Sequence, residues 1–164
     1  MMISEKMNSK LNEQITNEFN AHQTYLAMAC MFESMGLPLL AGHFRKQTEE
    51  EREHALKILD YVLDQGGKVE LQALPAPRAE YPTVLAAIEA AVEHEKKVTQ
   101  QIHDLCALAE SEKDYGTRTF LNWFCEEQVE EVASMEQLAA AARMCGQHLL
   151  QLEAYLIHHA KAEG

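Results

Sequence analysis

The sequence lacks any apolar run approaching the roughly 18 residues that a membrane-spanning helix requires. Its first residues also lack the apolar stretch of a signal peptide. Basic residues are scarce: the sequence has 14 Lys and Arg but 26 Asp and Glu, which gives a net charge of −12. Nucleic-acid binding needs a basic face, so this charge argues against it. We therefore expect a soluble, cytoplasmic protein with no membrane or nucleic-acid partner, and its acidity suits cations.

Cysteine is sparse as well, and no C-x-x-C pair is formed by the four cysteines, Cys30, Cys106, Cys125 and Cys145. Each lies within a helical pattern, so we expect free thiols in a reducing cytosol. Disorder is not expected, since 47% of the residues are hydrophobic. A chain of 164 residues has room for one proper core, and we expect a single domain over residues 1–164.

Hydrophobic periodicity and turn residues divide the chain into four long helices and a short C-terminal one. We expect them at about residues 7–35, 40–65, 83–112, 117–145 and 148–161. The first link is short, so the first two helices should be antiparallel neighbours. The connection over residues 68–82 is longer and, at about 3.3 Å per residue, reaches roughly 50 Å. A helix of about 26 residues is only roughly 40 Å long, so the third helix should run parallel to the second.

Each long segment has an apolar seam at alternating spacings of three and four residues, the pattern of a bundled helix. Near the midpoint of every seam lies an acid: Glu18, Glu51, Glu95 and Glu131. Two seams add a second polar residue three positions away, in Glu51-x-x-His54 and Gln128-x-x-Glu131. Side chains at this spacing leave the same helix face one turn apart. We therefore expect these polar groups to meet inside the bundle.

The four central acids predict a pair of metal ions. A buried, unpaired carboxylate costs several kcal/mol, and four at one level of a bundle repel one another. Two divalent cations would cancel the four negative charges if the histidine stays neutral. A metal-free structural bundle would instead require four separate burials of unpaired acid. Carboxylate oxygens with a single imidazole suit Fe(II), and suit Fe(III) better.

Three polar stretches extend this pattern across the chain. They are Glu49-Glu50-Glu51-Arg52-Glu53-His54, Glu93-His94-Glu95 and residues 122–131, which read NWFCEEQVEE. On the basis of these three stretches and their spacing, the chain resembles the prokaryotic non-haem ferritins along nearly its whole length. The resemblance implies an all-α, ferritin-like four-helix bundle with a long crossover between the second and third helices and a short fifth helix. It also implies a hollow shell of twenty-four subunits.

By this resemblance the central acids form a ferroxidase diiron centre. The residues implied for the first iron are Glu18, Glu51 and His54, and those for the second are Glu95 and Glu131, with Gln128 close by. Glu51 is implied to bridge the two irons.

A third iron site is implied beside the pair. Its ligands correspond to Glu50, Glu127 and Glu130, and it shares Glu131 with the second iron. Tyr25 and Trp123 match aromatic residues beside the diiron centre that can supply electrons during oxygen chemistry. Packing explains these two aromatics equally well.

Haem binding is not expected, because this chain departs from the bacterioferritins at two places. Their fourth helix has Glu-x-x-His where this chain has Gln128-x-x-Glu131, and their haem ligand is a Met where this chain has Arg52.

The implied function is iron storage with ferroxidase activity. Fe(II) would be oxidised by dioxygen or hydrogen peroxide at the diiron centre and stored as ferric mineral inside the shell. The alternative is a diiron oxidoreductase or peroxidase that protects against oxidative stress without bulk storage. Rubrerythrin-like peroxidases carry a C-x-x-C module, which this sequence lacks. Miniferritins place iron between subunits, which the ligand set within one bundle argues against.

Other polar residues are explained without metal. We expect a hydrogen-bonded core histidine at His22 and a surface pair at His158 and His159, with a channel between fifth helices as the alternative for the pair. A solvated helix face is expected for Glu49, Glu53 and Glu126.

Overall fold

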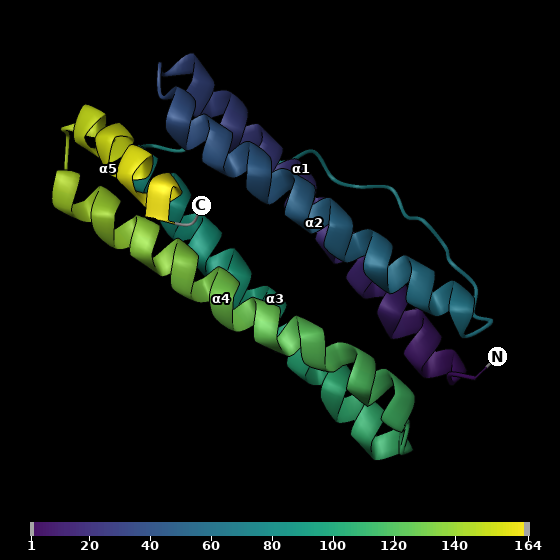
Figure 1. Cartoon of the computed structure of the whole chain (residues 1–164). Helices are drawn as coiled ribbons and strands as arrows, with labels where there is room; N and C mark the ends of the chain where they lie inside the picture. The colour runs from purple at the N-terminus through teal and green to yellow at the C-terminus, as the bar shows by residue number, and fades with distance from the viewer. Residues whose placement is uncertain (1, 163–164) are drawn as a thin grey trace.

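The computed structural model describes residues 2–162 as five α-helices (Figure 1). They are α1 (Glu5–Ser34), α2 (Pro38–Asp64), α3 (Val84–Glu112), α4 (Tyr115–Cys145) and α5 (Leu149–Ala162). The described residues contain no strand, so the predicted all-α class is confirmed. No described helix combines the length and the apolar character that crossing a bilayer demands.

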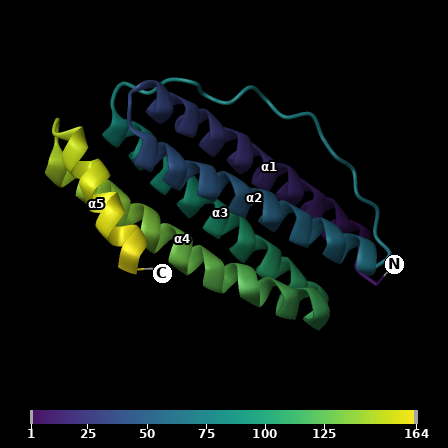
Figure 2. The same ribbon diagram turned by 45° about the horizontal axis from the view of Figure 1, so that its top comes forward.

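The four long helices form a bundle of two antiparallel pairs. α1 packs against α2 and α3 against α4, while the crossover after α2 runs back along the bundle (Figures 1 and 2). α3 therefore starts at the same end as α2 and runs parallel to it, as the length of the crossover predicted. Asn12 fastens the crossover to α1. Its side-chain amide donates to the Lys68 carbonyl oxygen at 2.8 Å, and its Oδ1 accepts from the Glu70 backbone N–H at 2.7 Å.

Local capping moves three helix starts away from the positions that periodicity predicted. α1 begins at Glu5 because the Ser4 hydroxyl accepts a hydrogen bond from a first-turn backbone N–H at 2.9 Å. α2 begins at Pro38, since proline suits the first helical position, where no N–H is needed. α4 begins two residues early because Asp114 caps it. The predicted cap of α3, Thr83, is confirmed.

The hydrophobic core consists of two clusters. One includes Tyr25 and Phe44 and lies toward the end of the bundle where α2 begins. The other includes Ile15 and Ile58 and lies toward the end where α1 begins. Polar side chains from all four long helices lie between the two clusters.

α5 is held to the bundle by the buried Leu152 and Leu156 and by one carboxylate. α5 contacts α2 and α4 (Figure 2), and α2 has no side-chain cap of its own at Leu37. Glu153 of α5 takes this role: its Oε2 accepts from the Leu39 backbone N–H at 2.9 Å and its Oε1 from that of Leu40 at 2.8 Å. A negative charge there also complements the positive end of the α2 dipole.

Glu153→Ala is expected to destabilise the protein by about 1–2 kcal/mol, because two backbone N–H groups lose their acceptor and α2 loses its counter-charge. The variant should show a lower thermal unfolding midpoint and faster proteolytic cleavage within α5. Gln151→Ala, at an exposed position on the same helix, is the control. Equal midpoints for the two variants would contradict the capping role of Glu153.

Candidate metal centre

Polar side chains from the four long helices fill the middle of the bundle, and we call this set the polar layer. Each member is between 0 and 5% exposed, and the members are Glu18 (α1), Glu51 and His54 (α2), Glu95 (α3), and Gln128 and Glu131 (α4). α2 and α4 each supply two members because a spacing of three residues repeats on one helix face. The structure thus buries all four central acids between the two hydrophobic clusters.

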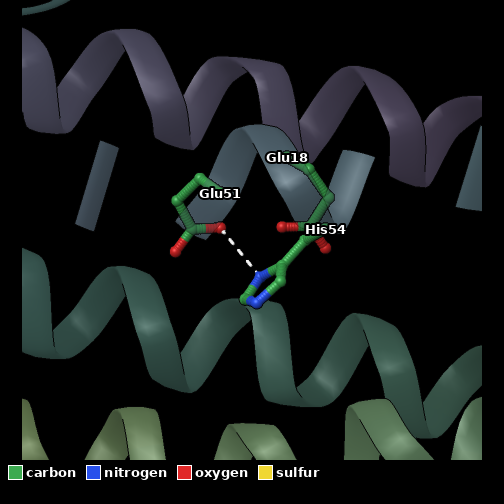
Figure 3. A group of neighbouring side chains, drawn as sticks. All are labelled: Glu18, Glu51 and His54. Atoms are coloured by element: carbon green, nitrogen blue, oxygen red, sulfur yellow. Dashed lines mark ion pairs between the residues drawn. The ribbon is translucent and has the colours of Figure 1, made fainter. Parts of the chain in front are cut away.

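The first group within the polar layer joins α1 to α2. Glu18, Glu51 and His54 each offer one ligand atom, and these atoms lie within 4.8 Å of one another. Figure 3 shows the three side chains converging, with His54 Nδ1 3.4 Å from Glu51 Oε2. Gln14 Nε2 donates to Glu18 Oε1 at 2.8 Å, whereas Glu18 Oε2 has no hydrogen-bond partner among the described residues. This second oxygen is therefore available to a cation.

The second group shares His54 with the first and extends the centre toward α4. His54, Glu127 and Glu131 offer ligand atoms within 4.8 Å of one another. His54 Nε2 lies 3.8 Å from Glu127 Oε1, so the imidazole has Glu51 at one nitrogen and Glu127 at the other. The resemblance assigned His54 to the first iron and Glu127 to the third. The structure places the two residues side by side, which makes the implied sites contiguous.

Glu95 is held by hydrogen bonds from two other helices. The Tyr25 hydroxyl donates to its Oε1, and Gln128 Nε2 donates to its Oε2 at 3.2 Å. Tyr25 is fully buried, and its ring packs edge-on against those of Phe44 and His94 at centroid distances of 5.8 Å and 5.6 Å. Glu95 therefore differs from Glu18, since both of its oxygens accept hydrogen bonds.

Burial dominates the electrostatics of the polar layer. Desolvation is the largest cause that raises the pKa of Glu18, Glu51 and Glu95, and it raises the pKa of Glu131 to about 8. The Glu95 carboxylate further raises the pKa of Glu51 and of Glu131. Burial, followed by Glu95, raises the pKa of the Tyr25 hydroxyl well above its usual value. With a pKa of about 8, Glu131 holds a proton near neutral pH, and a cation that binds there must displace that proton.

A cavity of about 620 Å³ opens beside the polar layer, and its walls come from α2, α4 and α5. Its lining includes Glu50, Glu127, Glu130 and Glu131, the residues that the resemblance assigns to the third iron. Exposure rises along this set: Glu131 is buried, Glu50 and Glu127 are half-buried, and Glu130 is exposed. His159 of α5 is half-buried and lines the same cavity, whereas a surface position was expected for it.

Two aromatic or imidazole side chains near the layer have clear packing partners. The Trp123 ring packs edge-on against the His54 ring at a centroid distance of 5.4 Å, and Lys57 Nζ lies 4.3 Å from the Trp123 centroid. His22 Nδ1 lies 2.9 Å from the Thr48 carbonyl oxygen, so the predicted hydrogen-bonded histidine is confirmed.

The predicted solvated helix face is confirmed too, because Glu49, Glu53 and Glu126 are exposed.

Sequence reasoning gave no role to two buried glutamines that touch candidate ligands. Gln14 donates to Glu18, and Gln47 Nε2 donates to Glu50 Oε2 at 2.9 Å. Gln14 is 2% and Gln47 6% exposed. Their spacing contained a signal, because residues three or four apart on a helix are neighbours.

Comparison with known proteins identifies close relatives. The family model described as "Ferritin-like domain" matches residues 8–145. The chain is 38% identical over 151 residues to ferritin BfrB of Mycobacterium tuberculosis, covering 92% of this chain and 83% of the relative. It is 39% identical over 135 residues to the bacterial non-heme ferritin of Staphylococcus saprophyticus, covering 82% of this chain and 81% of the relative. A solved open pore ferritin from Archaeoglobus fulgidus superposes with a TM-score of 0.92 at 42% identity, covering 94% of this chain and 96% of that one.

The metal-free protein is expected to lose stability as the pH rises from about 5 to about 8. An ordinary glutamate has a pKa of 4.5, whereas folding raises that of Glu131 to about 8. Between these values the folded state keeps a proton that the unfolded state has released, so a rise in pH favours unfolding. Thermal unfolding of chelator-treated protein across this pH range measures the effect.

Glu131→Gln removes this titration and should flatten the dependence of the unfolding midpoint on pH. Glu136→Gln, at an exposed position on the same helix, should keep the wild-type slope. If the unfolding midpoints of Glu131→Gln and of the wild type fell by the same amount between pH 5 and 8, the raised pKa of Glu131 would not be the cause of the pH dependence.

Proposed function

Because this chain belongs to the ferritin family, we propose that it is an iron-storage ferritin with ferroxidase activity. It oxidises Fe(II) with dioxygen or hydrogen peroxide at a diiron centre in the polar layer and keeps the product as ferric mineral inside a hollow shell of twenty-four copies. The observation that carries this proposal is the buried Glu18, Glu51 and His54 group, in which Glu18 Oε2 has no partner among the described residues.

Iron is the substrate, and the polar layer binds two Fe(II) ions side by side. Glu18 and His54 hold one ion, Glu95 and Glu131 hold the other, and Glu51 bridges them. Two divalent ions cancel the charge of the four carboxylates, which offsets the cost of their burial. Hard carboxylate oxygens then favour Fe(III) over Fe(II), so the ligand set pulls the reaction toward the oxidised product.

Paired binding also sets the electron count. Each Fe(II) gives up one electron, so the pair delivers two electrons to dioxygen, which takes up two protons and leaves as hydrogen peroxide. Release of the one-electron reduction product of dioxygen is thereby avoided. With hydrogen peroxide as the oxidant, two electrons and two protons yield two water molecules.

The cavity between α2, α4 and α5 supports a route for the oxidised iron. Its acids continue from the buried Glu131 to the exposed Glu130. A third iron bound by Glu50, Glu127 and Glu130 beside Glu131 would lie on this route, between the oxidation site and the mineral.

Glu51→Ala is expected to slow the first phase of aerobic Fe(II) oxidation by at least about tenfold, because even partners that only support metal ligands typically contribute that much. Rapid-mixing absorbance of the ferric product measures the rate. Glu53→Ala, at an exposed position two residues along α2, is the matched control and should behave as the wild type. After aerobic loading and separation by size, Glu51→Ala should also retain less iron than the wild type and Glu53→Ala. A wild-type first phase in Glu51→Ala would place the oxidation site elsewhere.

Zinc is expected to stall the oxidation. Affinity of such donor sets rises from Fe(II) to Zn(II), and zinc cannot be oxidised, so it should occupy the centre and block it. Preincubation with about two equivalents of Zn(II) per subunit, the stoichiometry of the pair, should abolish the fast phase. Mg(II), which binds nitrogen ligands poorly and keeps its water, is the control. An undiminished rate after zinc would count against a centre within the bundle.

A further inference from the structure

The buried glutamines of the described residues share one feature: each directs its side-chain amide at a carboxylate of the centre. They are Gln14, Gln47 and Gln128. Their Nε2 atoms donate to Glu18 at 2.8 Å, to Glu50 at 2.9 Å and to Glu95 at 3.2 Å, respectively. A buried amide is costly unless hydrogen-bonded. The repeated pairing with acids at the centre therefore points to a common purpose.

The orientation of Gln14 is set by three neighbours. Its Nε2 faces Glu18 Oε1 and also Gln101 Oε1, at 3.4 Å, while its Oε1 accepts from Asn17 Nδ2 at 3.3 Å. The amide is thus held with its N–H groups toward acceptors. One oxygen of Glu18 is fixed by this contact, and the other has no partner among the described residues and lies in the group with Glu51 and His54.

Gln47 makes the corresponding contact on the cavity side of the centre. It lines the cavity together with Glu50 and Glu131, and its Nε2 donates to Glu50 Oε2. The other oxygen of Glu50 lies 3.8 Å from Lys46 Nζ, a loose contact with an exposed side chain. Gln47 Oε1 is buried and has no hydrogen-bond partner among the described residues. The amide therefore fixes Glu50 more firmly than the lysine does.

We propose that Gln14 and Gln47 are positioning residues for two different parts of the centre. Gln14 holds Glu18 for the iron pair that is oxidised first, and Gln47 holds Glu50 for the third iron beside it. This assignment rests on the proposed function and deepens it.

An amide suits this task better than a charged donor. A lysine or arginine in the same place would hold the carboxylate but would also repel the incoming cation. A glutamine N–H orients the carboxylate without adding charge, as the outer partners of metal ligands do in other sites. Gln14 acts on Glu18, whereas Gln47 acts on Glu50 and also hydrogen-bonds Glu131, which lowers the pKa of that carboxyl against the larger rise from burial. Their loss should therefore affect the two phases to different extents.

Anaerobic Co(II) titration followed by visible absorption tests the assignment without turnover. Gln14→Met keeps the side-chain length but donates no hydrogen bond. It should weaken the tightest Co(II) binding by about 10- to 100-fold and change the Co(II) bands. Its first oxidation phase should slow correspondingly. Gln47→Met should disturb the tightest binding and the first phase less than Gln14→Met does, while it weakens the later Co(II) binding and alters the later phase more.

The matched control is Gln100→Met on α3. Gln100 is exposed, and its Nε2 donates to Asp104 Oδ1 at 2.8 Å, four residues along the helix, as Gln14 does to Glu18. This control should match the wild type in every readout. Gln14→Leu and Gln47→Leu repeat the tests if either methionine variant unfolds, as judged by circular dichroism.

Glu18→Ala separates failure of this inference from failure of the proposed function. If Glu18→Ala loses tight Co(II) binding while Gln14→Met keeps it, the positioning role is wrong and the diiron centre stands. The positioning role is equally wrong if the two glutamine variants impair one and the same phase to the same extent. If Glu18→Ala itself binds Co(II) and oxidises Fe(II) as the wild type does, the proposed centre is wrong.

Discussion

The rest of the structure depends on one constraint, the burial of four carboxylates at the middle of a helix bundle. Removal from water raises the pKa of every one of them, and repulsion by neighbouring carboxylates adds to this for Glu18, Glu51 and Glu131. The pKa of Glu131 reaches about 8. Such a layer opposes folding when no cation is bound, so the stability must come from elsewhere. The two hydrophobic clusters on either side provide it, since burial of apolar surface is the dominant favourable contribution to folding. Rigid helices anchored at both ends can then hold the acids in place for cations.

Hydrogen bonds distinguish these acids from one another. Glu95 accepts at both oxygens, from Tyr25 and from Gln128, whereas Glu18 accepts at only one from the described residues. A carboxylate that accepts hydrogen bonds at both oxygens can bind a cation only through its remaining lone pairs. Glu18 has one oxygen, Oε2, whose lone pairs are not used by a hydrogen bond from the described residues. The donors are neutral hydroxyl and amide groups, so they orient the acids without competing with a cation for their charge.

The spacing of three and four residues was enough to predict the bundle and the buried position of the four acids, and the length of the connection over residues 68–82 predicted the crossover. Each of these depends on which face of a helix turns inward, and that is a local property of the sequence. The confirmed family resemblance added the expected partners of these acids on neighbouring positions. Contacts that depend on how helices meet were not predicted. Glu153 caps a helix more than a hundred residues away in the chain, and Gln14 lies one position off the predicted seam.

The exposure of the acids increases from the polar layer outward into the cavity. On the α2 and α4 side they pass from the buried Glu131, through the half-buried Glu50 and Glu127, to the exposed Glu130. The attraction between a carboxylate and a cation weakens as water replaces protein around it. A cation is therefore held, under the proposed function, most tightly in the polar layer and less tightly at each step into the cavity. Under the proposed function, newly arriving Fe(II) would displace oxidised iron along this gradient, and α5, fastened by Glu153, would complete the wall that confines it.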